Sequence, residues 1–198
     1  MVTIHLTLEQ TRLCWENARK ASIGGTSRIR QSKDRKERLF EDQLVGQVGN
    51  CAGSVWWHGS DHDYRVTRDR ANENPLQGDG GSDLTGLNVD FKTSLMRRSK
   101  NPLDYKLLVR PAERHSDWIY LLLLVPTIEV EKIKADSGLD VVLVGWLGDD
   151  ELPEEPEGGG IFEGAYLVPA GKLHQIDGPR GQDVELTEKA WNCGRDGL

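Results

Sequence analysis

Residues 79–94 constrain the fold of this chain more than any other stretch. From Leu87 to Thr93 apolar and polar side chains alternate, which is typical of a β-strand with one buried face. Successive side chains of a strand point to opposite faces, so Asp90 and Lys92 share the face opposite the apolar residues. The pattern therefore predicts a strand that carries a carboxylate and an ammonium side by side.

The Thr85-Gly86 pair before this strand predicts a turn that folds Asp83 back beside Asp90. Two neighbouring carboxylates repel each other unless a cation lies between them. Their oxygens suit a hard divalent ion such as Mg²⁺ or Mn²⁺, and Lys92 could orient or help deprotonate a bound water. These residues indicate chemistry of the kind that cleaves phosphodiesters.

Asp83 followed after six residues by Asp90-Phe91-Lys92 resembles the D…(D/E)-x-K signature of the PD-(D/E)XK nuclease superfamily. The D-x-K core is short and occurs by chance in many proteins. The Gly-rich lead-in, the preceding helix and the strands that follow occur in the order of the family, across residues 40–176. The Gly-Asp-Gly-Gly-Ser-Asp lead-in and the Lys-Thr-Ser tail look like small stand-alone members from bacteria and their phages.

The resemblance implies an α/β fold of the restriction-endonuclease-like kind, with a central mixed β-sheet flanked by helices. It also implies that Asp83 and Asp90 bind Mg²⁺ or Mn²⁺, that Lys92 acts on the attacking water, and that DNA is the substrate. All three are predicted catalytic residues. Further residues expected to line the site are Gln47, Asp79, Thr93 and Ser94.

The family places a third acidic ligand on the helix before the motif. Residues 46–52 look like its G-x-x-G-E-x-A pattern, but the Glu position holds Asn50. An Asn oxygen can bind a metal, although without charge and therefore more weakly. At 100° per residue, Glu41 points to the opposite side of the helix, so the two cannot face one metal. The motif register favours Asn50, with Glu41 as the less favoured ligand.

The formal charge of −7, from 32 acidic and 25 basic residues, is unusual for a nucleic-acid-binding protein. Residues 149–163 contain seven acidic residues and no Lys or Arg, so the rest of the chain is near neutral. Basic residues cluster before the second helix and after the motif, and either cluster could contact phosphates or be solvated surface. The residues assigned to nucleic-acid binding are Arg35, Lys36, Arg97, Arg98 and Lys100.

The length of 198 residues fits one domain, 1–198, with an N-terminal helix in 1–27, an acidic loop insertion at 149–163 and a peripheral tail at 178–198. Three cysteines without metal-ligand spacing suggest a reducing compartment. The longest apolar run, Ile119–Pro126, is shorter than the ~20 residues that span a bilayer. We expect a cytoplasmic protein without membrane contact, and a homodimer is possible.

Local signals predict the remaining elements. Thr7 and Gln10 have the spacing of a capping box, which predicts a helix over residues 8–21. A second helix follows Ser32, and its glycines Gly46 and Gly49 weaken it unless a strand approaches closely. Its core face is expected to consist of Phe40, Leu44, Val48 and Cys51.

Residues 55–57 suggest a short strand or a packed corner, and the polar residues after them suggest turns. The histidines and aspartates at 58–63 match no zinc spacing and are expected to form turns. Strands are predicted at 105–110, 117–125 and 141–147, all in the central sheet, and a closing strand at 166–169. The strand at 117–125 is continuous enough in apolar character to be buried on both faces.

Other functions fit the same residues. The chain could be a catalytically degenerate member of the fold that binds DNA or protein, which Asn50 and the acidic charge favour. It could also hydrolyse a nucleotide or another small phosphoester. The simplest alternative is a surface hairpin with an ordinary Asp90–Lys92 ion pair.

Overall fold

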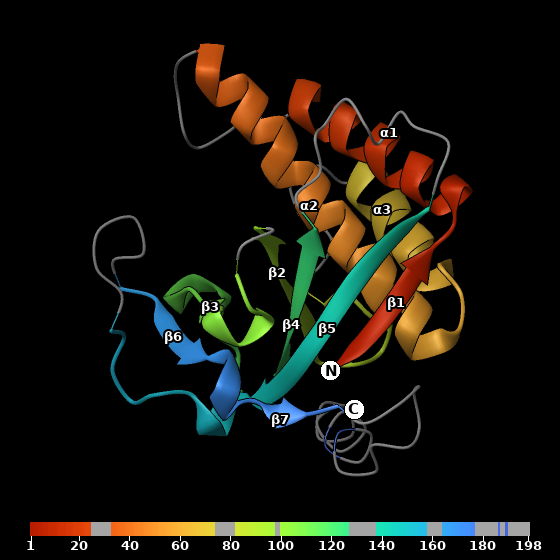
Figure 1. Ribbon diagram of the computed structural model, residues 1–198. Coiled ribbons are helices and arrows are strands. Elements are labelled where there is room, and N and C mark those ends of the chain that lie inside the picture. Colours follow the sequence, from red (N-terminus) through yellow and green to blue (C-terminus); the bar gives the residue numbers. More distant parts are fainter. Residues whose placement is uncertain are drawn as a thin grey trace.

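The computed structural model (Figure 1) describes residues 1–24, 33–73, 82–97, 100–126, 138–157 and 164–176, together with Leu186 and Lys189. Within these ranges, the side chains of residues 23, 24, 33–39 and 70–73 are not described. Asp79, Arg98 and Ser32, as well as the side chains of Arg35 and Lys36, therefore lie outside the described part of the chain, as does most of the predicted tail.

The described residues form an α/β structure around a mixed sheet. Its strands are β1 (Val2–Leu6), β5 (Leu139–Gly148), β4 (Ile119–Pro126) and β2 (Val89–Met96), in that spatial order, and β7 (His174–Gln175) pairs with β5. β2 and β4 run parallel, whereas the other neighbouring pairs are antiparallel. β2 ends this order, so one of its edges has no strand beside it in the described structure.

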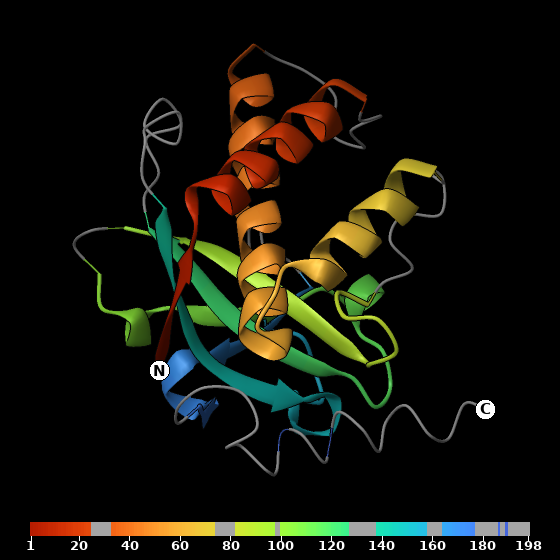
Figure 2. The same cartoon turned by 90° about the vertical axis from the view of Figure 1, so that its right-hand side faces the viewer.

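Three helices cover one face of the sheet: α1 (Leu8–Gly24), α2 (Lys33–His58) and α3 (His62–Glu73) (Figures 1 and 2). The predicted capping box starts α1, because the Thr7 hydroxyl accepts from the Gln10 amide over 3.3 Å and the Gln10 side chain accepts from the Thr7 amide over 2.9 Å. A second sheet, β3 (Lys106–Val109) with β6 (Tyr166–Pro169), packs on the opposite face through Leu107 and Val109.

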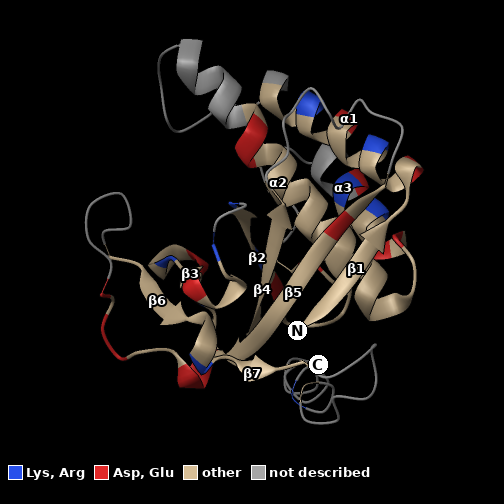
Figure 3. Ribbon diagram, viewed as in Figure 1, with Lys and Arg blue, Asp and Glu red and all other residues tan. Residues whose placement is uncertain are grey.

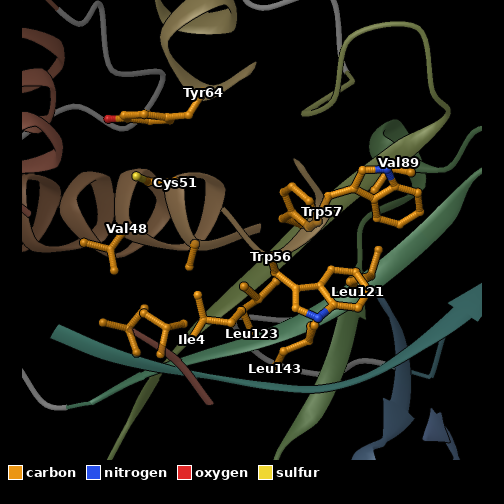
Figure 4. Close-up of a cluster of buried hydrophobic side chains, with 14 of the residues drawn as sticks. Ile4, Val48, Cys51, Trp56, Trp57, Tyr64, Val89, Leu121, Leu123 and Leu143 are labelled. Atoms are coloured by element: carbon orange, nitrogen blue, oxygen red, sulfur yellow. The ribbon is translucent and has the colours of Figure 1, made fainter. Parts of the chain in front are cut away.

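Two apolar clusters fill the space on either side of β4. Ile119, Leu121 and Leu123 belong to the cluster under the helices, and the alternate residues of β4 belong to the cluster under the second sheet. Figure 4 shows Val48 of α2 pointing toward the sheet, whereas Cys51 lies on the side of α2 that is nearer to Tyr64. The sequence correctly predicted that β4 is buried on both faces.

The core face predicted for α2 is also confirmed. Leu44, Val48 and Cys51 are buried, and Phe40 packs against their cluster while remaining partly exposed.

Three local predictions are wrong, and one strand was not predicted. Residues 55–57 are not a strand, because the apolar spacing of α2 continues to Trp56 and Trp57, which are both buried. α2 ends at His58, next to Gly59 with its φ of 71°, and residues 59–61 connect it to the next helix. His62 and Asp63, which were expected in turns, instead begin α3. The segment at 106–109 belongs to the second sheet, and β1 is the strand that the sequence did not predict.

Candidate functional site

The turn before β2 folds back as the sequence predicted. Gly86 adopts a φ of 76°, which favours glycine, and the Leu87 amide donates to the Leu84 carbonyl over 3.3 Å. The Thr85 amide donates to Oδ2 of Asp63 over 3.4 Å, and the same oxygen lies 2.8 Å from Nε2 of His58. His58, the last residue of α2, and Asp63, in the first turn of α3, thereby anchor the turn through hydrogen bonds.

The fold-back places Asp83 along the free edge of β2. Its amide donates to the Val89 carbonyl over 3.0 Å, and its Oδ2 accepts from the Phe91 amide over 2.7 Å. Its Oδ1 accepts from Nδ2 of Asn50, on α2, over 2.6 Å. Asp83 is only 7 % exposed, so these donors replace the water that would otherwise solvate its carboxylate.

Asn50 contacts the motif, but through its amide nitrogen. The nitrogen is a donor and points at the Asp83 carboxylate, so Asn50 orients this carboxylate in the structure. A glutamate at this position would bring a second negative charge against Asp83.

Asp90 and Lys92 lie on the opposite face of β2 from the helices, as their alternation predicts. Nζ of Lys92 is 2.7 Å from Oδ2 of Asp90 and 2.8 Å from Oε2 of Glu113. Burial disfavours the ammonium, but the charges and hydrogen bonds of the two carboxylates outweigh it and raise the pKa of Lys92. Lys92 is therefore a charged ammonium held between two carboxylates.

Glu113 is the residue of this cluster that the sequence analysis missed. It ends a short 3₁₀ turn, Pro111–Glu113, directly after β3, and its Oε1 lies 2.8 Å from Nη1 of Arg110. Burial opposes its ionisation, but the hydrogen bonds and charges of Lys92 and Arg110 outweigh burial and lower the pKa of Glu113. It lies 21 positions from Lys92, in the turn that follows a strand of the second sheet, so no local sequence signal points to it.

A cavity of about 500 Å³ lies beside the second half of β2. Lys92, Thr93 and Ser94 line it, as does Glu41 from α2. Gln47 does not line it, because its side chain is buried and accepts a hydrogen bond of 2.8 Å from the hydroxyl of Tyr64 on α3. Thr93 and Ser94 are therefore next to a cavity, whereas Gln47 is part of the packing between helices.

The metal implied by the resemblance requires oxygen ligands. In the described part of the chain, no three side chains of His, Cys, Asp or Glu form a group that could hold a metal ion. Mg²⁺ is usually bound through one or two carboxylates together with substrate phosphates and waters. Asp83, which lies beside the edge of β2, and Asp90, on the strand itself, supply the number of carboxylates that such an open site uses, but not the ligands of a closed protein cage.

The described basic residues do not gather on one face. Lys and Arg, blue in Figure 3, occur on α1, on α3 and near β3. Lys100 lies over the ring of Tyr105 at 5.8 Å, and the Arg97 amide donates to the hydroxyl of the same tyrosine over 2.6 Å. These contacts fix the segment after β2 next to the second sheet.

Comparisons with protein-family models, with curated proteins and with solved structures found no match to this chain. Among the described residues, no helix has the length and apolar character needed to cross a bilayer. The fold is thus an α/β structure with a mixed sheet, and its function has to be argued from the site.

Proposed function

We propose that this protein is a metal-dependent nuclease that hydrolyses DNA phosphodiester bonds. The observation that supports the proposal is the position of Asp83, whose carboxylate accepts a hydrogen bond from the amide that directly follows Asp90. A chance D…D-x-K pattern would not require its first Asp to fold back onto the strand that carries the other two residues. The restriction-endonuclease-like topology implied by the resemblance is part of this proposal.

Asp83 and Asp90 are the residues that would hold Mg²⁺ or Mn²⁺. A bound ion of this kind supplies Lewis acidity toward a phosphate oxygen and lowers the pKa of a coordinated water. The network around Asp83 defines its orientation, because Asn50 and the Phe91 amide each donate to one of its oxygens. Such preorganisation reduces the rearrangement needed when substrate binds.

Lys92 is expected to act as a cation and not as a base. Its pKa is raised by Asp90 and Glu113, so at neutral pH it has no free electron pair with which to accept a proton. Its ammonium would instead donate hydrogen bonds to the attacking water or to a phosphate oxygen. It would thereby stabilise the negative charge that develops on the phosphate.

A second candidate is a degenerate member of the fold that binds DNA or protein without cleaving it. The pairing of Asn50 with Asp83 supports this alternative, because the neutral amide satisfies the carboxylate where the family has a third acidic ligand. The two candidates predict opposite results in the same experiment.

The experiment incubates purified protein with supercoiled, linear and single-stranded DNA in Mg²⁺, in Mn²⁺ and in EDTA. The Lys92→Met variant is compared with Lys106→Met, which removes the same charge from an exposed position on β3. We expect metal-dependent cleavage that Lys92→Met abolishes and Lys106→Met retains. Circular dichroism and the urea midpoint establish that both variants are folded.

Cleavage that persists unchanged in Lys92→Met would refute the assignment of the site. If the folded wild type cleaves no DNA under any metal, the nuclease proposal fails. Binding of labelled DNA would then support the degenerate module, and turnover of a small phosphate ester would support the phosphoester hydrolase.

A further inference from the structure

Glu113 lies where the two sheets meet, although it is not part of the D…D-x-K motif. The turn that carries it is fixed at both ends: the Glu113 amide donates to the Arg110 carbonyl over 2.9 Å, and the Tyr120 hydroxyl donates to the Glu113 carbonyl over 3.3 Å. The Tyr120 hydroxyl in turn accepts from the His115 amide over 2.9 Å. The backbone of Glu113 is thereby attached to β4, the neighbour of β2.

The Glu113 carboxylate uses its two oxygens for two different cations. Oε2 lies 2.8 Å from the ammonium of Lys92, and Oε1 lies 2.8 Å from the guanidinium of Arg110. The Lys92 side chain is 16 % exposed and that of Arg110 is 67 % exposed. Glu113 therefore lies between the mostly buried ammonium of Lys92, at the motif, and the exposed guanidinium of Arg110, which lines the cavity.

A lysine ammonium sits on a flexible four-carbon stem and has three donor hydrogens. Asp90 alone, on the same strand, leaves the ammonium free to rotate about that contact. Glu113 approaches from the second sheet and gives the ammonium a second fixed acceptor. The two acceptors come from different elements, so together they restrict where Nζ can lie.

We infer that Glu113 is a positioning residue that holds the ammonium of Lys92 in place for chemistry at Asp83 and Asp90. This inference rests on the proposed nuclease function for its consequence in catalysis. The contact between Glu113 and Lys92 can be measured without any activity. An experiment can therefore refute the positioning role of Glu113 without refuting the nuclease proposal, and the reverse.

The test compares Glu113→Gln with Glu154→Gln, which removes the same charge from an exposed position of the acidic segment. The ¹⁵Nζ chemical shift of Lys92 is followed from about pH 8 to 12 in lysine-labelled protein and assigned with the Lys92→Arg variant. Glu113→Gln should lower the titration midpoint of Lys92, because one carboxylate instead of two then offsets the burial of its ammonium. Glu154→Gln should leave the midpoint unchanged.

The same variants are assayed for DNA cleavage across pH. Misplacement of a catalytic group reduces turnover more than binding, so Glu113→Gln should lower kcat by about 10- to 100-fold with KM changed less than about threefold. The alkaline limb of its kcat profile should shift to lower pH by the same number of pH units as the Lys92 midpoint. A residue that only stabilises the fold would leave that limb in place.

An unchanged Lys92 midpoint in folded Glu113→Gln would overturn the inference, whatever its activity. If the wild type cleaves no DNA, the nuclease proposal fails and the midpoint still decides whether Glu113 holds Lys92. Should Glu113→Gln not fold, Arg110→Gln is used instead. This variant removes the cation that competes for Glu113, so the midpoint should stay or rise, and a lower midpoint would contradict the inference.

Discussion

The close packing of α2 on β2 can be tested at Gly53. An ideal Cβ at this position lies 2.3 Å from Cε2 of Phe91, whereas a Cβ at Gly46 on the same helix meets nothing within 4 Å. Gly46→Ala should stabilise the protein by up to about 1 kcal/mol, because alanine is the better helix former. Gly53→Ala has the same gain in propensity but forces the buried Phe91 ring away from α2, which typically costs about 1–3 kcal/mol.

The propensity gain is common to both variants and cancels when they are compared. Gly53→Ala should therefore be less stable than Gly46→Ala by about 1–3 kcal/mol, or on the order of 2–12 °C in Tm for a domain of this size. Urea denaturation followed by tryptophan fluorescence measures the difference, because Trp56 and Trp57 lie at the end of the same helix. Equal midpoints for the two variants would refute the packing described here.

Two further predictions concern buried polar contacts. Tyr64→Phe removes the donor to Oε1 of the buried Gln47 and should destabilise the protein by about 1–3 kcal/mol in urea denaturation; a loss below about 0.5 kcal/mol would contradict this contact. The lowered pKa of Glu113 means that its ionised form stabilises the fold above the pKa of an unfolded glutamate, and that this contribution disappears as pH falls through the lower folded value. Stability of Glu113→Gln should consequently fall less steeply than that of the wild type below about pH 5, and parallel curves would show that the carboxylate is not held by its cations.

The sequence predicted elements whose signals are local. The capping box at Thr7 started α1, and the continuous apolar run of β4 indicated a strand buried on both faces. The close approach of a strand to Gly49 was one of the alternatives considered, and an ideal Cβ there would lie 2.0 Å from Oγ1 of Thr93. The first two predictions succeeded because each depends on a few neighbouring residues. The approach at Gly49 stayed one of two alternatives because its partner, Thr93, lies on a strand that is distant in sequence.

Predictions that depend on distant partners failed. β1 is a five-residue strand whose pairing partner, β5, begins at Leu139. The strand at 106–109 was recognised, but its own side chains do not show that it pairs with β6 instead of the central sheet. Glu113 follows β3 and meets Lys92 only because the second sheet packs on the first.

The role of Asn50 can be tested by placing a negative charge at this position. Asn50→Asp has nearly the same shape, but it would put a carboxylate where Nδ2 now lies 2.6 Å from Oδ1 of Asp83. The variant loses a hydrogen bond to a charged group, worth about 1.5–3 kcal/mol, and adds repulsion between like charges. In EDTA at about pH 8 its Tm should fall well below that of the wild type, and it should partly recover at about pH 5, where one of the two carboxylates takes up a proton.

Asn50→Ser is the matched control, because it removes the amide without adding charge. If Asp83 belongs to a metal site, Mg²⁺ should raise the Tm of Asn50→Asp more than that of Asn50→Ser. At a Mg²⁺ concentration of 100 times its own Kd, Asn50→Asp should gain about 2.7 kcal/mol of stability. An equal response of both variants to Mg²⁺ would mean that no cation binds between positions 50 and 83. The hydrogen bond from Asn50 to Asp83 would then stabilise the site without a metal ion, which supports the degenerate binding module.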